Sequence, residues 1–280
     1  MNKKVLCFFS ILLPAFLTFK PAAAQVSIAP TSVFIHDRDN VASLFVSNGS
    51  QVAQEISISF EFAYPGSDES GNMTTIENDS VSAQKFGLGS RVKVFPRQFV
   101  LAPNGQQTVR FQVLPLQGKP DGVYWTRIII SSQQATKDVD TVKVSQGIGT
   151  KINFVLKQNI PCFYIKGKVS TGLSIADVKS TVEKNKLTAV TRVLPTGNAP
   201  FNGSVIAKLT NDSGKEVTSH QQTIVAYFEA LRKIEIPLPE GIKSGKYNLE
   251  LTYETSRADI SPSDLVQATP VKKTVVVVIP

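Results

Sequence analysis

Side chains that could carry out catalysis are few in this sequence, and they lie far apart. His36 and His220 are its only two histidines, and neither has a second histidine or a cysteine at a spacing typical of metal ligands. The chain contains no nucleophile elbow, no phosphate-binding glycine loop and no dinucleotide fingerprint. These observations favour a protein that is not an enzyme and that uses no metal and no cofactor.

The N-terminal segment has the pattern of a secretory signal peptide. Two lysines form a short basic start, residues 5–19 are almost entirely apolar, and small alanines precede Gln25. We therefore expect residues 1–24 to be cleaved and the mature protein to reach the periplasm. No later stretch is long enough to span a bilayer, so no integral membrane segment is expected. Cys7 is lost with the signal peptide, and the apolar neighbours of Cys162 predict a buried, unreactive thiol.

The charge of the chain is mildly basic. There are 30 Lys and Arg residues against 22 Asp and Glu residues, a formal net charge of +8. Without the three lysines of residues 1–24 the balance is 27 against 22, or +5. Nucleic-acid-binding proteins gather their basic residues into a patch, whereas here they are spread along the chain. The composition therefore argues against a nucleic-acid partner.

Short stretches in which apolar and polar residues alternate recur along the chain, and that period of two predicts β-strands. The sharpest case is a series of one parity: Ile56, Ile58, Phe60 and Phe62. About seven such strands precede residue 157 and no stretch predicts a helix, a pattern typical of an immunoglobulin-like sandwich. Residues 66–84, rich in Ser, Asp, Asn and Gly, are expected to form a long exposed excursion.

A second set of strands follows and predicts a second sandwich. We therefore expect an all-β fold of two immunoglobulin-like sandwich domains in tandem, with residues 25–157 in the first and residues 158–280 in the second. Residues 159–161 are expected to be a short stiff connection between them. The last strand, TVVVVI, is β-branched and uncharged, so we expect it to be paired inside its sheet.

Residues 141–156 predict a long strand that closes the first domain. Five of its apolar residues share one parity: Val142, Val144, Ile148, Ile152 and Phe154. The polar Gln146 interrupts this series. Such a strand can be an ordinary closing strand of a sandwich, or its front half can pair with another chain along a free edge.

Four stretches resemble, in the correct order, segments of the PapD-like periplasmic pilus chaperones. These stretches are QVSIAPTSVFI at 25–35, FPRQFVLAPNGQQTVRF at 95–111, PDGVYWTRIII at 120–130 and GTKINFVL at 149–156. The resemblance covers the first domain and fades in the second. It implies the immunoglobulin-like sandwich of that family and a role in binding other proteins.

In that family the closing strand lends alternating side chains to a pilus subunit that lacks a strand. The resemblance implies four donor positions in this chain: Val142, Val144, Gln146 and Ile148. The family also binds the client's terminal carboxylate with an arginine on the first strand and a lysine on the closing strand. This chain has Ser32 and Asn153 at those two places, so neither cation is present. Lys151, on the parity of Asn153, is the candidate replacement for the lysine, and Arg38 or Arg91 for the arginine.

Two functions follow as hypotheses. The first is a periplasmic chaperone that caps a pilin-like or other β-rich secreted subunit by donating its closing strand, and that delivers the subunit to an outer-membrane usher. The second is a non-enzymatic structural or scaffolding protein of the cell envelope that exchanges no strand. The two missing cations favour the second hypothesis, and the four ordered stretches favour the first.

Overall fold

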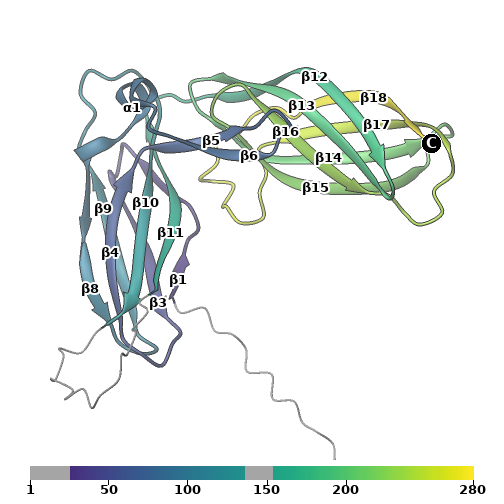
Figure 1. Ribbon diagram of the computed structural model, residues 1–280. Helices are drawn as coiled ribbons and strands as arrows, with labels where there is room; N and C mark the ends of the chain where they lie inside the picture. Colours follow the sequence, from purple (N-terminus) through teal and green to yellow (C-terminus); the bar gives the residue numbers. More distant parts are fainter. Residues whose placement is uncertain (1–25, 136–153) are drawn as a thin grey trace, which may run out of the picture.

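Strands dominate both parts of the chain that the computed structural model describes, residues 26–135 and 154–280. They form two β-sandwiches in tandem, which confirms the expected all-β fold class. The sandwiches meet end to side and give the molecule an L shape (Figure 1). The inner corner of the L is called the elbow below.

Two sheets make up the first sandwich. A four-stranded sheet has the order β1-β3-β9-β7, and a five-stranded sheet has the order β2-β11-β10-β4-β8. The strands are β1 (Val26–Ala29), β2 (Val33–His36), β3 (Val41–Asn48), β4 (Gln54–Glu61), β7 (Val92–Phe95), β8 (Gln98–Leu101), β9 (Gln106–Val113), β10 (Gly122–Gln134) and β11 (Val155–Lys166). The first two described strands therefore lie in different sheets, β1 in the four-stranded sheet and β2 in the five-stranded sheet.

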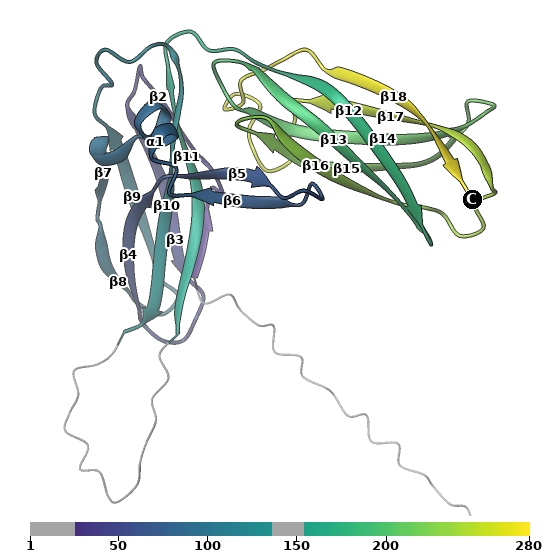
Figure 2. The ribbon, with the colours of Figure 1, turned by 45° about the horizontal axis from the view of Figure 1, so that its top comes forward.

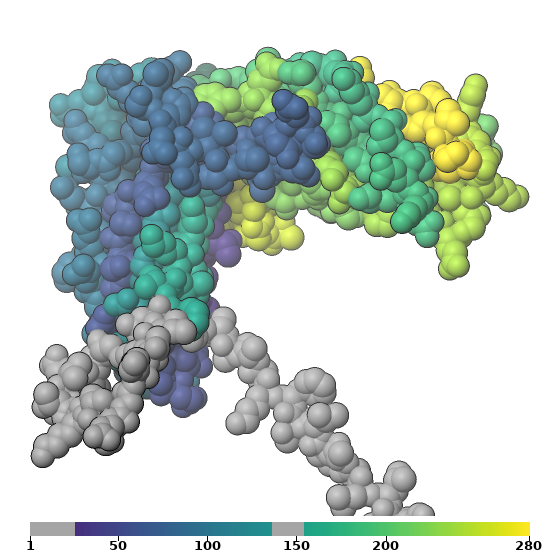
Figure 3. Space-filling model, viewed as in Figure 1, coloured from purple at the N-terminus to yellow at the C-terminus, as the bar shows by residue number. Residues whose placement is uncertain are grey.

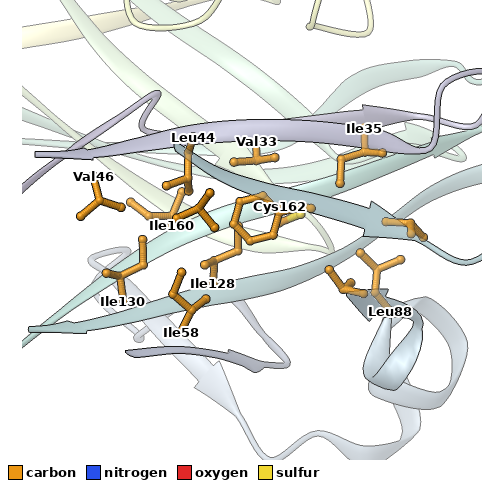
Figure 4. Packing of buried hydrophobic residues seen from close by; sticks show 14 of the residues in the cluster. Val33, Ile35, Leu44, Val46, Ile58, Leu88, Ile128, Ile130, Ile160 and Cys162 are labelled. Carbon is orange, nitrogen blue, oxygen red and sulfur yellow. The ribbon is translucent and has the colours of Figure 1, made fainter. Parts of the chain in front are cut away.

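Residues of one parity from each sheet fill the space between the sheets (Figure 4). Ile56 and Ile58 are buried there, as their alternation predicts, and Phe60 packs against the same core. Phe62 does not share their side. Because β4 ends at Glu61, the pleat no longer determines the direction of Phe62, which instead stacks on Trp125 with ring centroids 5.8 Å apart.

The expected connection at residues 159–161 is instead the middle of β11. This strand pairs with β10 over its whole length, from the pair Gln133 and Val155 to the pair Gly122 and Lys166. The first sandwich therefore continues beyond the expected boundary at residue 157. Pro161 does not break the strand, because its nitrogen points away from β10 and no hydrogen bond of that pairing is lost.

The expected exposed excursion at residues 66–84 is an ordered insertion. This insertion extends beyond the expected bounds, from residue 63 to residue 91. It comprises the hairpin β5 (Ala63–Ser67) and β6 (Met73–Glu77), followed by the helix α1 (Ser80–Phe86) and the 3₁₀ turn η1 (Gly89–Arg91). The Asp79 side chain caps α1 by accepting from the Ser82 backbone N–H at 3.0 Å. The expectation of no helix is therefore wrong, because a seven-residue helix is too short to show a helical period.

The second sandwich also has two sheets, of orders β12-β13-β16 and β15-β14-β17-β18. Its strands are β12 (Thr171–Glu183), β13 (Lys186–Gly197), β14 (Phe201–Asn211), β15 (Glu216–Ala226), β16 (Ala230–Pro237), β17 (Gly245–Glu254) and β18 (Val271–Ile279). The last strand is not inside its sheet as expected: β18 pairs with β17 alone and lies at the edge. Val277 and Ile279 face the core, while Val276 and Val278 are exposed.

An aromatic cluster joins the two sandwiches. Trp125 and Phe163 of the first sandwich pack against Tyr227 of the second, with ring centroids 4.9 and 6.0 Å from that of Tyr227. The β5–β6 hairpin extends from the first sandwich along the second (Figures 1 and 3). It is held there by main-chain contact, because the Lys233 N–H donates to the Gly71 carbonyl at 2.9 Å.

Arg232 of β16 also holds this hairpin against the second sandwich. Only 5% of the residue is exposed. Its guanidinium donates to the carbonyls of Gly66 on the hairpin, at 2.9 Å, and of Val225 in the second sandwich, at 2.8 Å. A buried cation that joins backbone groups of both sandwiches makes their relative orientation part of the fold.

Candidate functional site

Among the described residues, the first half of β11 has a strand on one side only. Its pairing with β10 covers residues 155–166, whereas its pairing with β2 covers residues 162–165. The strand that precedes β2 in the chain, β1, pairs with β3 in the opposite sheet. Within the described residues, positions 155–161 of β11 therefore form a free strand edge, called the open edge below. It lies below the elbow, on the side of the first sandwich that the second sandwich overhangs (Figure 1).

One hydrogen bond and the alternation of a strand decide which backbone groups point to the open edge. The Ile165 carbonyl accepts from the Asp37 N–H at 3.0 Å, so the backbone of Ile165 faces the β2 side. Residues two apart in a strand point their backbone groups to the same side. Pro161, which has no N–H, shares that parity and thus costs the β10 ladder no hydrogen bond. The N–H and C=O groups of Val155, Lys157 and Asn159 accordingly point to the open edge.

The side chains at this edge divide by parity. Ile160 points into the core, and the Gln158 side chain on the same face donates to the Val26 carbonyl at 3.0 Å. At the beginning of the strand, Phe154, Val155 and Leu156 are 80%, 52% and 46% exposed. Unpaired backbone groups next to exposed apolar side chains are the features by which a sheet edge accepts a strand from another chain.

A cation lies on the neighbouring strand β10, two residues after Trp125 of the aromatic cluster. Arg127 of β10 is opposite Pro161 of β11 and opposite Glu61 of β4. Its Nε is buried and has no hydrogen-bond partner among the described residues. Burial raises the pKa of the Tyr227 hydroxyl, and the positive charges of Arg127 and Arg257 act in the opposite direction. The charges of both guanidinium groups therefore act on Tyr227, which lies in the aromatic cluster between the sandwiches.

Of these two groups, Arg257 already has a partner. Its Nε donates to Asp259 Oδ1 at 2.9 Å. Arg127 forms no salt bridge among the described residues. Arg127 is thus the cation at the elbow that is free to bind an anion brought by another molecule.

The residues singled out from the sequence have different outcomes. The four donor positions, Val142, Val144, Gln146 and Ile148, and also Lys151 and Asn153, lie outside the described residues. Ser32 is buried one position before the first residue of β2 that pairs with β11. Arg38 is exposed and paired with Asp39 at 3.0 Å, and Arg91 ends η1.

Sequence reasoning did not single out Arg127. The available signal was its isolation, because Arg127 is the one charged residue in the apolar run VYWTRIII of residues 123–130. A charged residue in a strand that is otherwise buried needs a partner or a function.

Three further features of the described residues bear on metals, thiol reactivity and membranes. No group of three or more His, Cys, Asp or Glu side chains is placed to hold a metal ion in them. Burial raises the pKa of the Cys162 thiol to about 12, so the thiol stays protonated at physiological pH. In the same part of the chain, no helix combines the length and the apolar character needed to cross a membrane.

The comparisons with known proteins return solved structures only. No family model and no curated protein matches the sequence. The chain is similar to the YadV chaperone, with 10% identity, a TM-score of 0.46 and coverage of 89% of this chain and 100% of that chain. It is similar to the CsuC–CsuE complex, a chaperone with a tip adhesion subunit from archaic chaperone–usher Csu pili of Acinetobacter baumannii. That match has 11% identity, a TM-score of 0.44 and coverage of 89% and 98%. A third match is the complex of the Salmonella enterica SafA pilin with the SafB chaperone, at 13% identity, a TM-score of 0.41 and coverage of 89% and 96%.

Proposed function

We propose that the protein is a periplasmic chaperone that holds strand-deficient, pilin-like subunits by adding its own strand edge to their incomplete sheet. The observation that carries this proposal is the open edge of β11, whose backbone groups at Val155, Lys157 and Asn159 have no strand beside them among the described residues. A subunit that lacks one strand exposes the complementary row of unpaired groups. Pairing the two edges satisfies both rows and covers the exposed apolar side chains at residues 154–156.

The donor positions Val142, Val144, Gln146 and Ile148 belong to this proposal. They precede β11 in the chain, so a client strand that pairs with the open edge would continue along them. Each apolar donor would fill one gap in the client's core, where burial of an aliphatic side chain contributes about 1.5–3 kcal/mol. The polar Gln146 would contribute less, so the client should have a shallower or more polar gap at that place.

The elbow supplies the end point of the bound strand. Arg127 lies across β11 from the open edge, opposite Pro161, near the point where that edge meets β2. A client strand that runs up the open edge would bring its terminal carboxylate to this guanidinium, and a charge-assisted hydrogen bond there contributes about 1.5–3 kcal/mol. Arg127 would thus replace the cations that are missing at Ser32 and Asn153. Release of the client to an outer-membrane usher completes the proposed role.

The test uses the pilin-type subunit encoded nearest to this protein's own gene. The subunit is diluted from denaturant into the protein without residues 1–24, and the mass of the product is measured by size-exclusion chromatography with light scattering. We expect a one-to-one complex in which the amides of Val155, Lys157 and Asn159 become protected from hydrogen exchange. The matched control is the same subunit with its missing strand fused in cis, which should not bind. Equal binding of the two subunits would contradict strand addition.

A structural role in the cell envelope is the second candidate. It is favoured by Ser32, which carries no charge where the resemblance leads us to expect an arginine. The same measurement separates the two functions. A scaffolding protein binds neither form of the subunit, and its amides at the open edge exchange equally fast in all samples.

A further inference from the structure

The four-stranded sheet of the first sandwich has one face in the core and the other face outward. In this sheet β9 lies between β3 and β7 (Figure 2). Residues paired across strands place their side chains on the same face, so the pairing assigns two rows to the outward face. The rows are Val41, Gln112 and Lys93, and Ser43, Arg110 and Phe95. These residues and Phe45 of β3 are all exposed, and they are called the basic face below.

The basic face carries positive charge and no negative charge. No Asp or Glu residue occurs in β1, β3, β7 or β9. Lys93 and Arg110 are diagonal neighbours on adjacent strands, an arrangement that places side chains about 7–8 Å apart. Neither forms a salt bridge within the described residues. Two like charges at this separation repel each other, and a bound anion would relieve the repulsion.

The charged residues that flank the basic face do not cancel its charge. In the turn between β2 and β3, Asp39 is paired with Arg38 at 3.0 Å. Asp37 of the same turn accepts from the backbone N–H of Gly167 at 2.7 Å. Arg91, immediately before β7, is exposed and has no salt bridge in the described part of the chain. Four cations against two carboxylates leave a net charge of +2 for the basic face and these flanking residues.

Apolar side chains lie beside the cations. Phe95 is 78% exposed and is directly opposite Arg110 on the neighbouring strand. A hollow of about 450 Å³ lies on the same sheet, and its lining includes Val41, Lys93 and Arg110. No acidic side chain of the described residues lines this hollow. Its volume is within the range of sites that hold a small polar or apolar group of a ligand.

The arrangement of the apolar residues favours a membrane over a folded protein as the partner. Arg110 separates Phe95 from β3, and Ser43 separates Val41 from Phe45. The basic face therefore lacks the continuous apolar centre that is typical of protein interfaces. At a bilayer surface, by contrast, single rings enter the boundary between headgroups and acyl chains, while Lys and Arg attract anionic headgroups.

We propose that the basic face binds the surface of a membrane that contains anionic phospholipids. Lys93 and Arg110 contact the phosphate groups, and Phe45 and Phe95 enter the layer beneath them. The open edge of β11 belongs to the opposite sheet and takes no part in this contact. The inference does not depend on the chaperone function proposed above.

The test is sedimentation of the protein with lipid vesicles. The protein is prepared without residues 1–24, because the apolar residues 5–19 would bind lipid themselves. One vesicle preparation is pure phosphatidylcholine, and the other contains equal parts of phosphatidylcholine and phosphatidylglycerol. We expect the protein to sediment with the second preparation only. Added salt should release it, because salt screens the attraction between charges.

Two variants test the residues of the basic face. K93Q/R110Q should lower the partition coefficient for the anionic vesicles about 30-fold, because each cation near an anionic surface strengthens binding roughly fivefold. Phe95→Ser should lower it about tenfold through loss of the buried ring. K246Q/K273Q removes two exposed lysines of β17 and β18, and this matched control should bind as the unaltered protein does. All replaced side chains are exposed, so the urea midpoints should be alike.

Two outcomes of the vesicle assay would overturn the proposal: equal sedimentation with both preparations, or equal binding by K93Q/R110Q and K246Q/K273Q. A parallel titration uses poly-L-glutamate. Binding of this polymer without binding of the anionic vesicles would also overturn the proposal and would indicate an acidic protein as the partner. No pilin-type subunit is present in these assays, so failure of the membrane proposal leaves the chaperone function standing.

Discussion

Proline substitutions along β11 distinguish the open edge from the paired edge. At Lys157 or Asn159, proline removes an N–H that points away from β10, as Pro161 already does in the native strand. At Gln158 it removes an N–H that faces β10. The first two substitutions should therefore weaken client binding and leave the sandwich folded, whereas the third should destabilise the sandwich itself.

The size of each effect follows from the hydrogen bonds involved. One main-chain hydrogen bond to a client contributes about 0.5–1.5 kcal/mol net, so the double variant K157P/N159P should lose about 1–3 kcal/mol of binding free energy. That loss corresponds to a roughly 5–150-fold rise in Kd. In Q158P, a carbonyl of β10 is left without its donor, and the Gln158 side-chain bond to Val26 is also lost. Its free energy of unfolding should fall by about 2–4 kcal/mol.

Two measurements test the predicted effects of these proline variants on stability and on client binding. Urea unfolding followed by Trp125 fluorescence gives the stability of each variant without the client. Titration of each variant with the fluorescently labelled pilin-type subunit gives Kd, with K157A/N159A as the control that keeps both N–H groups. The reasoning is refuted if K157P/N159P binds the subunit as tightly as the control, or if it loses as much stability as Q158P.

Three further predictions concern single residues. Arg127→Gln should raise the Kd of the subunit by roughly 10–100-fold through loss of a charge-assisted contact, and should change little for a subunit whose C-terminus is amidated; an equal loss for both would rule out carboxylate binding. Cys162 should not react with a thiol reagent at pH 8 in the folded protein but should react fully in urea, because burial raises its pKa from 9.0 to about 12. Since the unfolded thiol ionises first, the free energy of unfolding should fall as pH rises through that range. Arg232→Met should cost about 2–4 kcal/mol of stability and speed proteolysis of the hairpin at residues 68–72, whereas the exposed Arg192→Met should cost under about 1 kcal/mol; equal unfolding midpoints for the two variants would show that Arg232 does not hold the hairpin.

Local patterns in the sequence were enough to predict the class of fold. A strand buries one face, so Ile56 and Ile58 are apolar while their neighbours are polar, and this can be read without knowing any partner strand. The same reasoning failed at Phe62, where the pleat ends, and at α1, which is too short to repeat its period. It also failed at Pro161, because a proline indicates a connection unless the direction of its nitrogen in the sheet is known.

The candidate site, by contrast, depends on contacts between distant parts of the chain. The sequence by itself determined that the chain forms short alternating strands and that it lacks catalytic motifs, and it predicts an export signal at residues 1–24. Only the tertiary structure decided that β2 pairs with β11 no further down than residue 162, which leaves an open edge among the described residues. It also decided that Arg127 of β10 lies opposite Pro161, across β11 from that edge. The physical reason is that hydrophobic alternation specifies which face of a strand is buried, whereas the neighbour on each edge is chosen by backbone hydrogen bonds, which every residue type can form.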